Sequence, residues 1–380
     1  MKKILIVSYT FYPEISPRAF RTLELAKELA KNNDVTILTK INEEIKDMKF
    51  KNNLKIKQIN SGFLFNKNIK NKKNDSLEKI RANKKYSFLR KIYRYLFAES
   101  EMEFAVPIFK ELKKDEETYD AIISIARPFS DHLGVYLSKI FNPKISKIII
   151  LDYGDPFYKS ITNKRGYHFK IIERLVLKKA NYVTIPILEA QRAYEIFKID
   201  KKIKVIPQGF NLKELNNPKK VEIKNRNFMY AGAFYEEIRN PLFLFEKLNS
   251  LKENFIFNIY TSIDRLKNSQ FGKKILEEIE KSNGKIILKD VISREKIIEK
   301  MKEMEFLINL ENINTEQSPS KLIDYAISGR PILSFNQENF DIEIFKEFLD
   351  GNYKNKKTVE LEKYDIKNVA KQFQELIEGE

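Results

Sequence analysis

Short apolar segments of strand length alternate with stretches of helical periodicity along most of this 380-residue chain. A strand-like run at 3–8 leads into a helical pattern at 18–32, and the alternation starts again after Pro207. The predicted strands are 3–8, 34–38, 121–125, 147–151, 182–185, 204–206, 228–231, 255–260, 285–288, 306–310 and 331–335. Strands that are apolar throughout, joined by amphipathic helices, are typical of parallel sheets covered on both faces.

Two runs of this alternation, one on each side of the connection 207–213, predict an α/β chain with two Rossmann-like domains facing across a cleft. We place the domains at 1–206 and 207–362, and expect the last segment, 363–380, to be a helix that packs back on the first domain. Ligands of such sheets bind beyond the carboxyl ends of the strands, so function is expected in the loops that follow strands.

The amino-acid composition argues against several kinds of catalytic and metal site. The chain has no cysteine, which excludes disulfides and thiol nucleophiles, and its two histidines, His132 and His168, argue against a multi-histidine metal centre. It has no Asp-x-Asp pair of the kind that holds a metal–diphosphate complex, so we expect no metal in the site. The apolar start ends at Pro13 without a cleavage site, and no apolar run approaches the roughly 20 residues of a membrane span. These features predict a cytoplasmic protein.

A strongly basic insert interrupts the first domain at about 65–97. Residues 65–94 hold eleven basic side chains against two acidic ones, in a chain whose net charge is +17. One helical face of the insert carries Phe88, Leu89, Ile92, Tyr93 and Leu96, and another carries Arg90, Lys91 and Arg94. This pattern suits a helix that lies on an anionic membrane surface. A plain surface helix packed on the first sheet, with lysines that serve only as solvated surface, explains it as well.

The sharpest signal is the segment 316–331, directly after the predicted strand 306–310. Ser318 is a good N-cap, Pro319 suits the first helical position, and Gly329 is a good helix terminator. A short helix should therefore begin near Pro319. The free N–H groups of its first turn and its dipole favour an anion there.

Polar side chains gather around that helix start. Lys321 adds a positive charge, and Glu316 lies where a carboxylate can accept hydrogen bonds from sugar hydroxyls. Ser320, Lys321 and Asp324 share the face opposite the buried one, so Asp324 points to where a ribose would lie. An ordinary capped helix with exposed charges is the alternative interpretation.

A second element, 230–241, follows the first strand of the second half. Gly232 permits a close approach to the backbone at the strand end. Arg239, just before a helix that should start near Pro241, can bind a diphosphate with its forked pair of donors. A surface arginine before a proline explains Arg239 equally well.

These two elements together resemble the C-terminal half of family 4 glycosyltransferases, which have the two-domain GT-B fold. That family has a glutamate, seven residues and a second glutamate; Glu316 matches the first, and Asp324 takes the place of the second. It also has a Gly-Arg pair followed six residues later by a lysine. Here Gly232 matches, Ala233 replaces the arginine, and Arg239 takes the lysine position.

Other segments extend the resemblance over most of the chain. The segments 4–13 and 205–211 resemble the family's opening strand and interdomain connection. The segments 128–132 and 152–157 resemble a branch of the family that makes bacterial surface polysaccharides. The resemblance implies that the C-terminal half binds a nucleotide sugar and that the N-terminal half binds the acceptor.

The resemblance also implies roles for individual residues. Glu316 would bind the sugar hydroxyls and Asp324 the ribose. Arg239, Lys321 and the N-terminus of the helix would stabilise the diphosphate leaving group, and Gly232 and Ser320 would be further donor-binding residues. Many members use a histidine after the strand that corresponds to 147–151, where this chain has Asp155. Asp155 is then a candidate base or sugar contact, or else only a helix cap before Pro156.

Three side chains of the first half are candidates for the acceptor. Arg18 and Arg21 lie one helical turn apart after the first strand, where they could bind the phosphate of a lipid-linked acceptor or be mere surface charge. His132 lies near the start of a later helix and is another cleft candidate, although a lone histidine is more often structural.

We therefore expect a retaining glycosyltransferase, of hexosyl or N-acetylhexosaminyl type, that needs no cofactor besides its nucleotide-sugar donor. Its acceptor would be a lipid-linked saccharide in the synthesis of capsule, O-antigen or other lipopolysaccharide, at the anionic inner face of the cell membrane. A nucleotide-sugar epimerase of the same fold is the first alternative. A basic nucleic-acid-binding protein is the second, although no nucleic-acid-binding motif is present and nucleic acid is not the expected partner.

Overall fold

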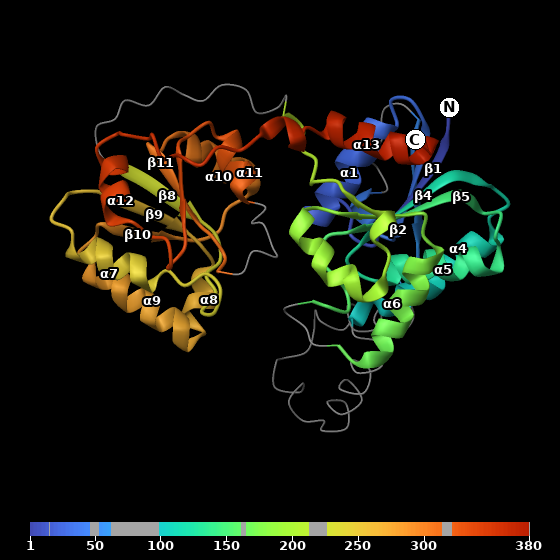
Figure 1. The fold of residues 1–380 in the computed structure, drawn as a ribbon, viewed down its shortest axis with the longest axis horizontal. Coiled ribbons are helices and arrows are strands. Elements are labelled where there is room, and N and C mark those ends of the chain that lie inside the picture. Colours follow the sequence, from blue (N-terminus) through green and yellow to red (C-terminus); the bar gives the residue numbers. More distant parts are fainter. Residues whose placement is uncertain are drawn as a thin grey trace. The chain divides into compact units, whose positions relative to one another are not determined.

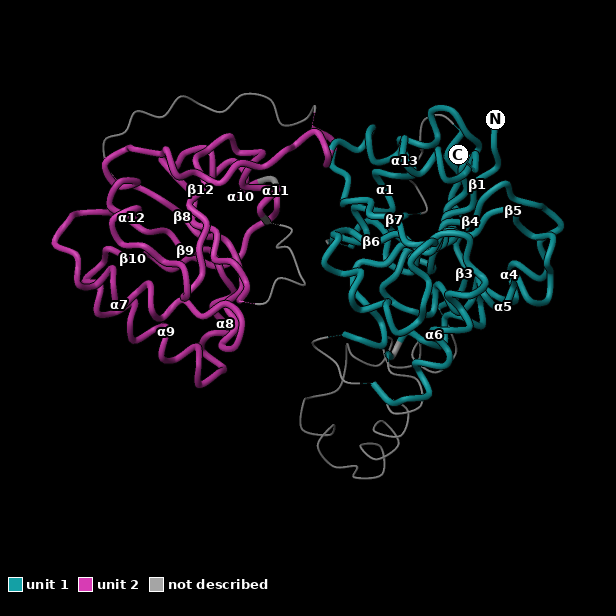
Figure 2. The backbone as a smooth tube through the Cα atoms, viewed as in Figure 1, with its two compact units in different colours: residues 1–210, 365–380 teal, residues 211–364 magenta. Residues whose placement is uncertain are grey.

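The computed structural model describes residues 1–14, 16–45, 53–61, 99–160, 165–212, 226–313 and 321–379. Two compact units are present, one of residues 1–210 and 365–380 and the other of residues 211–364 (Figure 2). Each unit has its own parallel sheet, so the predicted α/β fold with two Rossmann-like domains is confirmed.

Unit 1 holds a seven-stranded sheet in the order β3-β2-β1-β4-β5-β6-β7 within the described ranges. Figure 1 labels β1, β2, β4 and β5 of this sheet. Its strands are β1 Lys3–Val7, β2 Asp34–Lys40, β3 Leu54–Ile59, β4 Tyr119–Ala126, β5 Ser146–Tyr153, β6 Tyr182–Ile185 and β7 Ile203–Val205. Its α-helices are α1 Pro17–Leu29, α4 Ala105–Lys114, α5 Ser130–Phe141, α6 Tyr167–Lys179 and α13 Ile366–Glu378. Short 3-10 segments are η1 Glu43–Ile45, η4 Ser100–Phe104, η5 Leu188–Phe197 and η6 Asp200–Lys202.

Apolar side chains cover both faces of this sheet. On one face Leu5 and Val7 of β1 join a core with α4, α5 and α6. On the other face Ile4 and Ile6 join a core with α1 and α13. Successive residues of a strand point to opposite faces, so the uninterrupted apolar run of β1 serves both cores.

The end of the chain belongs to unit 1. Phe210 and Asp365 pair as a parallel bridge, and the Ile366 N–H donates to the Phe210 carbonyl at 2.9 Å. An added Cβ at Gly209 would lie 2.5 Å from Cδ1 and 3.3 Å from Cα of Ile366, so the two segments of the chain pack closely at this glycine. Helix α13 follows, and it buries Phe373 in the core that α1 shares.

Unit 2 holds a five-stranded sheet in the order β10-β9-β8-β11-β12, again counted over the described residues. Its strands are β8 Asn227–Ala231, β9 Ile256–Tyr260, β10 Ile286–Lys289, β11 Phe306–Leu310 and β12 Ile332–Phe335. Its helices are α7 Leu242–Ser250, α8 Ile263–Lys267, α9 Gln270–Lys281, α10 Arg294–Lys302, α11 Lys321–Ile327, α12 Ile342–Leu349 and the 3-10 segment η8 Leu361–Tyr364. Its core is aromatic: the Phe228 ring stacks on Phe257 and on Phe306, each at a centroid distance of 4.7 Å.

The strands lie close to where the sequence predicted them. Each predicted strand coincides with an observed one, and the structure adds β3 at an edge of the first sheet. Lys55 and Lys57 alternate with apolar residues in β3, so it lacks the continuous apolar run that marked the other strands. The basic insert at 65–97 lies outside the described residues, and its membrane role stays a prediction. No helix in the described ranges is long and apolar enough to cross a membrane.

The packing of α13 predicts a large stability loss for Phe373→Ala. The Phe373 side chain is fully buried, and the Arg21 guanidinium lies 4.9 Å from its ring centroid. Removing such a ring should lower the free energy of unfolding by roughly 3–5 kcal/mol. Denaturant unfolding measures this, with Lys371→Ala on the exposed face of the same helix as the control. Equal unfolding midpoints for the two variants would show that α13 does not stabilise unit 1.

Candidate functional site

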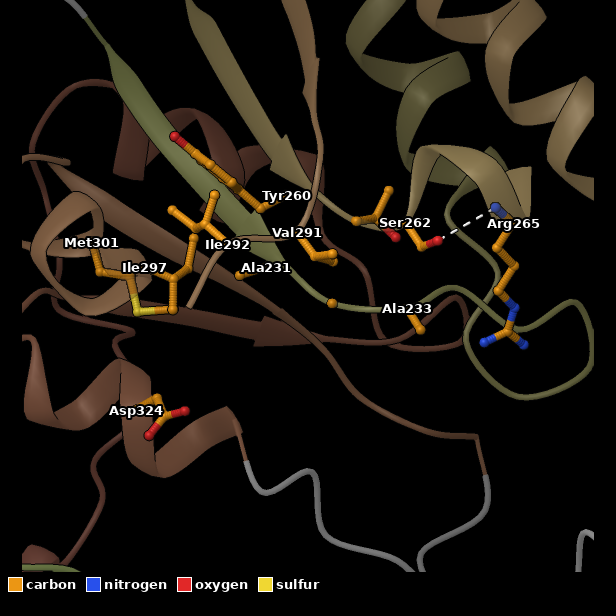
Figure 3. Close-up of a pocket in the computed structure, with 12 residues that line it drawn as sticks. Ala231, Ala233, Tyr260, Ser262, Arg265, Val291, Ile292, Ile297, Met301 and Asp324 are labelled. Atoms are coloured by element: carbon orange, nitrogen blue, oxygen red, sulfur yellow. Dashed lines mark hydrogen bonds between the residues drawn. The ribbon is translucent and has the colours of Figure 1, made fainter. Parts of the chain in front are cut away.

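A pocket of about 300 Å³ lies in unit 2 at the carboxyl ends of three neighbouring strands, β8, β9 and β10. Gly232 and Ala233 line it after β8, and Ser262 lines it after β9. Figure 3 shows apolar side chains, among them Ile292 and Met301, gathered at one end of the pocket, while Arg265 comes from α8 at the other. A pocket with an apolar end and a few polar groups is the usual form of a site for a mixed apolar and polar ligand.

Arg265 is held in place from two sides. The backbone N–H of Arg265 donates to Oγ of Ser262, the N-cap of α8, at 3.3 Å. Its guanidinium lies 4.7 Å from the Tyr235 ring centroid, a cation–π contact. The sequence analysis missed Arg265. The available signal was a capping serine after the strand with a cation three residues later, the same device as at Ser318 and Lys321.

Asp324 lines the pocket from α11, so Gly232 and Asp324 are brought together as the sequence predicted. The Asp324 Oδ1 accepts two hydrogen bonds from Arg294, at 3.0 Å from Nε and 2.6 Å from Nη2. The Tyr325 hydroxyl accepts the Ala231 N–H at 2.8 Å and thereby joins α11 to the end of β8. Arg294 was missed, because it lies 30 positions from its partner in the sequence.

Arg239 is not among the described residues that line this pocket. Its Nε and Nη2 donate to Oδ1 of Asn312, after β11, at 3.1 and 2.7 Å. Its backbone pairs with Tyr235 in both directions and closes the loop after β8. The Arg239 side chain thus contacts the loop that follows β11, and its role as a diphosphate contact stays a proposal.

The other residues predicted at the start of the helix near Pro319 fall in or next to the segment 314–320, which is outside the described residues. Glu316, Ser318 and Ser320 lie outside the described residues, and of Lys321 only the backbone, at the start of α11, is described. Gly329 has φ of 71°, the left-handed conformation expected of the glycine that ends a helix. The roles of Glu316, Ser320 and Lys321 remain predictions.

In unit 1, Asp155 follows the end of β5 beside a tightly packed arginine. An added Cβ at Gly154 would lie 2.7 Å from Nε of Arg18, so the guanidinium rests directly on this glycine. Arg18 donates to Oδ2 of Asp152 at 3.0 Å, and its side chain is 16% exposed. Asp155 is half-buried and makes no hydrogen bond or ion pair with any described residue. No helix starts at Pro156, so the alternative of a helix cap is wrong, and Asp155 acts on the nearby Arg18 through its charge.

The prediction that Arg21 contacts the acceptor is wrong, because this side chain is only 1% exposed. It donates to Oδ2 and Oδ1 of Asp152 at 3.2 and 3.1 Å and to the Pro207 carbonyl at 2.6 Å. Thr184 completes the site with a 2.6 Å bond to Asp152. Burial raises the pKa of Asp152, but the two guanidinium groups outweigh it and hold this pKa below its usual value.

The prediction that His132 faces a cleft is also wrong. The ring is fully buried, with Nδ1 2.7 Å from the Ser124 hydroxyl and a centroid distance of 4.3 Å to Tyr153. Burial lowers the pKa of His132 to about 3, so the imidazole is neutral at physiological pH. His132 is a structural residue behind Tyr153.

Glu173 supports the loop that follows Asp155. It is buried on α6, and its Oε2 accepts the Tyr158 N–H at 2.9 Å. Burial raises the pKa of Glu173 to about 7, and the nearby Arg165 opposes that rise. The sequence analysis missed this residue, although an acid at helical spacing between the buried Phe169 and Val176 was visible.

Glu173 should make stability fall as pH rises from 4.5 to about 7. Its pKa in the folded chain, about 7, lies above the ordinary 4.5, so the folded state holds this proton more tightly than the unfolded chain. The unfolding free energy therefore falls between those two pH values, by at most on the order of 3 kcal/mol. Glu173→Gln keeps a neutral side chain and should gain stability relative to the wild type as pH rises across that window. Denaturant unfolding at several pH values tests this against the exposed Glu189→Gln, and parallel curves for wild type and Glu173→Gln would contradict it.

The described residues hold no group of three or more acidic or histidine side chains placed to bind a metal ion. The two parallel sheets, with the last helix returned to the first unit, define the GT-B class of fold.

No family model and no curated protein sequence matches the chain. Solved structures do match over its full length. Anabaena HepE in complex with UDP-glucose is 11% identical, with 100% of both chains covered and a TM-score of 0.63. A glycosyltransferase from Rickettsia africae is 15% identical, with 100% of this chain and 98% of that one covered and a TM-score of 0.65. The lipopolysaccharide outer core galactosyltransferase WaaB is 13% identical, with 99% of both covered and a TM-score of 0.58. The chain thus shares the fold of these proteins.

Proposed function

We propose that this protein is a retaining glycosyltransferase that moves a hexose or N-acetylhexosamine from a nucleoside-diphosphate sugar to a saccharide acceptor. The observation that carries the proposal is the pocket at the ends of β8, β9 and β10, in a fold shared with HepE bound to UDP-glucose. Ligands of parallel sheets bind at this edge.

The donor contacts follow from the two ends of the pocket. The apolar end, with Ile292 and Met301, suits a flat base, and Asp324, oriented by Arg294, suits the ribose hydroxyls. The Gly232 N–H is already used, because it donates to the Tyr260 carbonyl at 2.8 Å. Arg265 supplies a cation for the diphosphate at the polar end. We add it to the diphosphate contacts proposed from the sequence, Arg239 and Lys321, beside which Ser320 is a further donor-binding residue.

The proposed chemistry is substrate-assisted transfer without a metal. The bond from the anomeric carbon to the diphosphate breaks as the acceptor oxygen attacks the same face, and the acceptor proton passes to the leaving phosphate. Arginine and lysine side chains stabilise the negative charge that develops on the diphosphate. Glu316 would hold the sugar hydroxyls. Asp155, half-buried and close enough to Arg18 to interact with its charge, would hydrogen-bond the sugar or the acceptor hydroxyl.

The acceptor is proposed to be a lipid-linked saccharide of a bacterial surface polysaccharide, such as capsule or lipopolysaccharide. WaaB, which shares the fold, is a lipopolysaccharide outer core galactosyltransferase. Of the arginines proposed for the acceptor phosphate, only Arg18 remains, since it is partly exposed. A cytoplasmic protein that meets such an acceptor works at the inner face of the membrane.

A nucleoside diphosphate should stabilise the protein in the presence of EDTA. At ligand 100 times its Kd, the gain is about 2.7 kcal/mol, visible as a thermal shift. Arg265→Ala should weaken this shift, because the variant loses the cation at the polar end of the pocket. Lys267→Ala, exposed on the same helix but not lining the pocket, is the matched control. A shift that EDTA abolishes, or none with any common nucleoside diphosphate, would count against the proposed donor site.

Asp155→Asn should reduce turnover without changing nucleotide binding. The carboxylate belongs to unit 1, whereas the proposed nucleotide pocket belongs to unit 2. Loss of a preorganised contact of this kind costs on the order of 100-fold in rate. Nucleotide release from the donor sugar measures turnover, with Asp200→Asn, exposed on η6, as the control. Wild-type turnover in Asp155→Asn would remove this residue from the site, and epimerised donor without acceptor would identify an epimerase instead.

A further inference from the structure

Helix α6 of unit 1 exposes a row of large apolar side chains. Tyr167, Ile171 and Leu175 follow one another at a spacing of four residues and are 67%, 51% and 46% exposed. This spacing places them along one stripe of the helix. A helix on the surface of a globular protein ordinarily turns such a stripe inward and presents charge to water.

The same face is strongly basic. Lys170 and Arg174 lie along one edge of the stripe, Lys179 lies along the other, and Lys178 lies at its C-terminal end, as 100° per residue requires. None of these four cations pairs with an acid among the described residues. The one acid of the helix, Glu173, is buried on the opposite face.

An apolar stripe edged by cations that no described acid neutralises is complementary to one kind of surface, an anionic lipid bilayer. Aliphatic and aromatic side chains enter the headgroup region, while lysine and arginine reach the lipid phosphates. A second copy of this face would bring the same positive charge against it and be repelled. Nucleic acid would satisfy the cations but leave Ile171 and Leu175 in water.

The inner face of α6 connects this surface to the proposed active site. Glu173 accepts the Tyr158 N–H at 2.9 Å, three residues beyond Asp155 in the same loop. A bilayer against the outer face would therefore lie on the far side of the helix that supports the Asp155 loop. A lipid-linked acceptor needs its reacting sugar close to the membrane surface.

We propose that the outer face of α6, formed by Tyr167, Lys170, Ile171, Arg174, Leu175 and Lys178, docks the protein on an anionic bilayer. The inference rests on the proposed function, because it supplies the membrane at which a lipid-linked acceptor is met. It is separate from the basic insert at 65–97, whose role rests on sequence alone.

The test is sedimentation of the full-length protein with vesicles of phosphatidylglycerol and phosphatidylethanolamine, compared with phosphatidylcholine alone. The wild type should bind the anionic vesicles, and the triple variant Lys170→Glu, Arg174→Glu, Lys178→Glu should bind them at least tenfold more weakly. A matched triple variant, Lys252→Glu, Lys273→Glu, Lys274→Glu at exposed lysines of unit 2, changes net charge equally and should bind as wild type. The variant Ile171→Ser, Leu175→Ser keeps every charge and should lose the binding that survives high salt.

Several results would overturn the docking surface. The first is a wild type that does not bind anionic vesicles. The second is an α6 triple variant that sediments with them as wild type does. The third is binding that is lost only when Arg90, Lys91 and Arg94 are changed to glutamate. A dimer that the α6 variants dissociate would make this face a contact between copies, and RNA or DNA binding lost with the same variants would make it a nucleic-acid site.

A thermal shift with UDP, or with whichever nucleoside diphosphate binds the wild type, is recorded for every variant. An intact shift shows that a variant is folded and binds nucleotide, so lost vesicle binding reports on α6 alone. If no nucleotide shifts the wild type, the proposed donor site fails, while vesicle binding still decides whether α6 docks on membranes.

Discussion

The buried carboxylate of Asp152 fixes much of unit 1. It lies at the end of β5, accepts hydrogen bonds from Arg18, Arg21 and Thr184, and is 2% exposed. A buried carboxylate is costly unless its charge is compensated, and here two guanidinium groups compensate it. Through these bonds α1, β5 and β6 are held together, and Arg21 also reaches the Pro207 carbonyl at the exit from the sheet. The rigid end of β5 then positions Gly154 and Asp155.

The two units use the same edge of the sheet in different ways. In unit 1 the end of β5 carries the buried Asp152 and Tyr153, and the half-buried Asp155 follows beside Arg18. In unit 2 the strand ends leave a pocket of about 300 Å³ with an apolar and a cationic end. A division between an acceptor side and a donor side is consistent with these two sites and with the shared fold.

The sequence was sufficient to predict the features that depend on local patterns, namely the strands, the fold class and two residues of the pocket. Continuous apolar runs located the strands, and the fold class followed. Among the strands of the described residues, only β3, with Lys55 and Lys57, was not predicted. Gly232 and Asp324 were found because a glycine at a strand end and a charge in a capped helix are local signals. Local patterns do not encode which way a charge on a helix finally faces. Arg21 meets Asp152 across 131 positions, and Arg294 meets Asp324 across 30, so burial and pairing were decided by tertiary packing.

The central claim is that a sugar moves from a nucleoside diphosphate to an acceptor with its anomeric configuration retained. The most direct measurement is incubation of the purified protein with single nucleotide sugars and a lipid-linked saccharide extract, followed by NMR of the anomeric proton coupling in the product. The account predicts a new glycoside with the same anomeric configuration as the donor. An inverted product, or a donor sugar that changes configuration without being transferred, would contradict it.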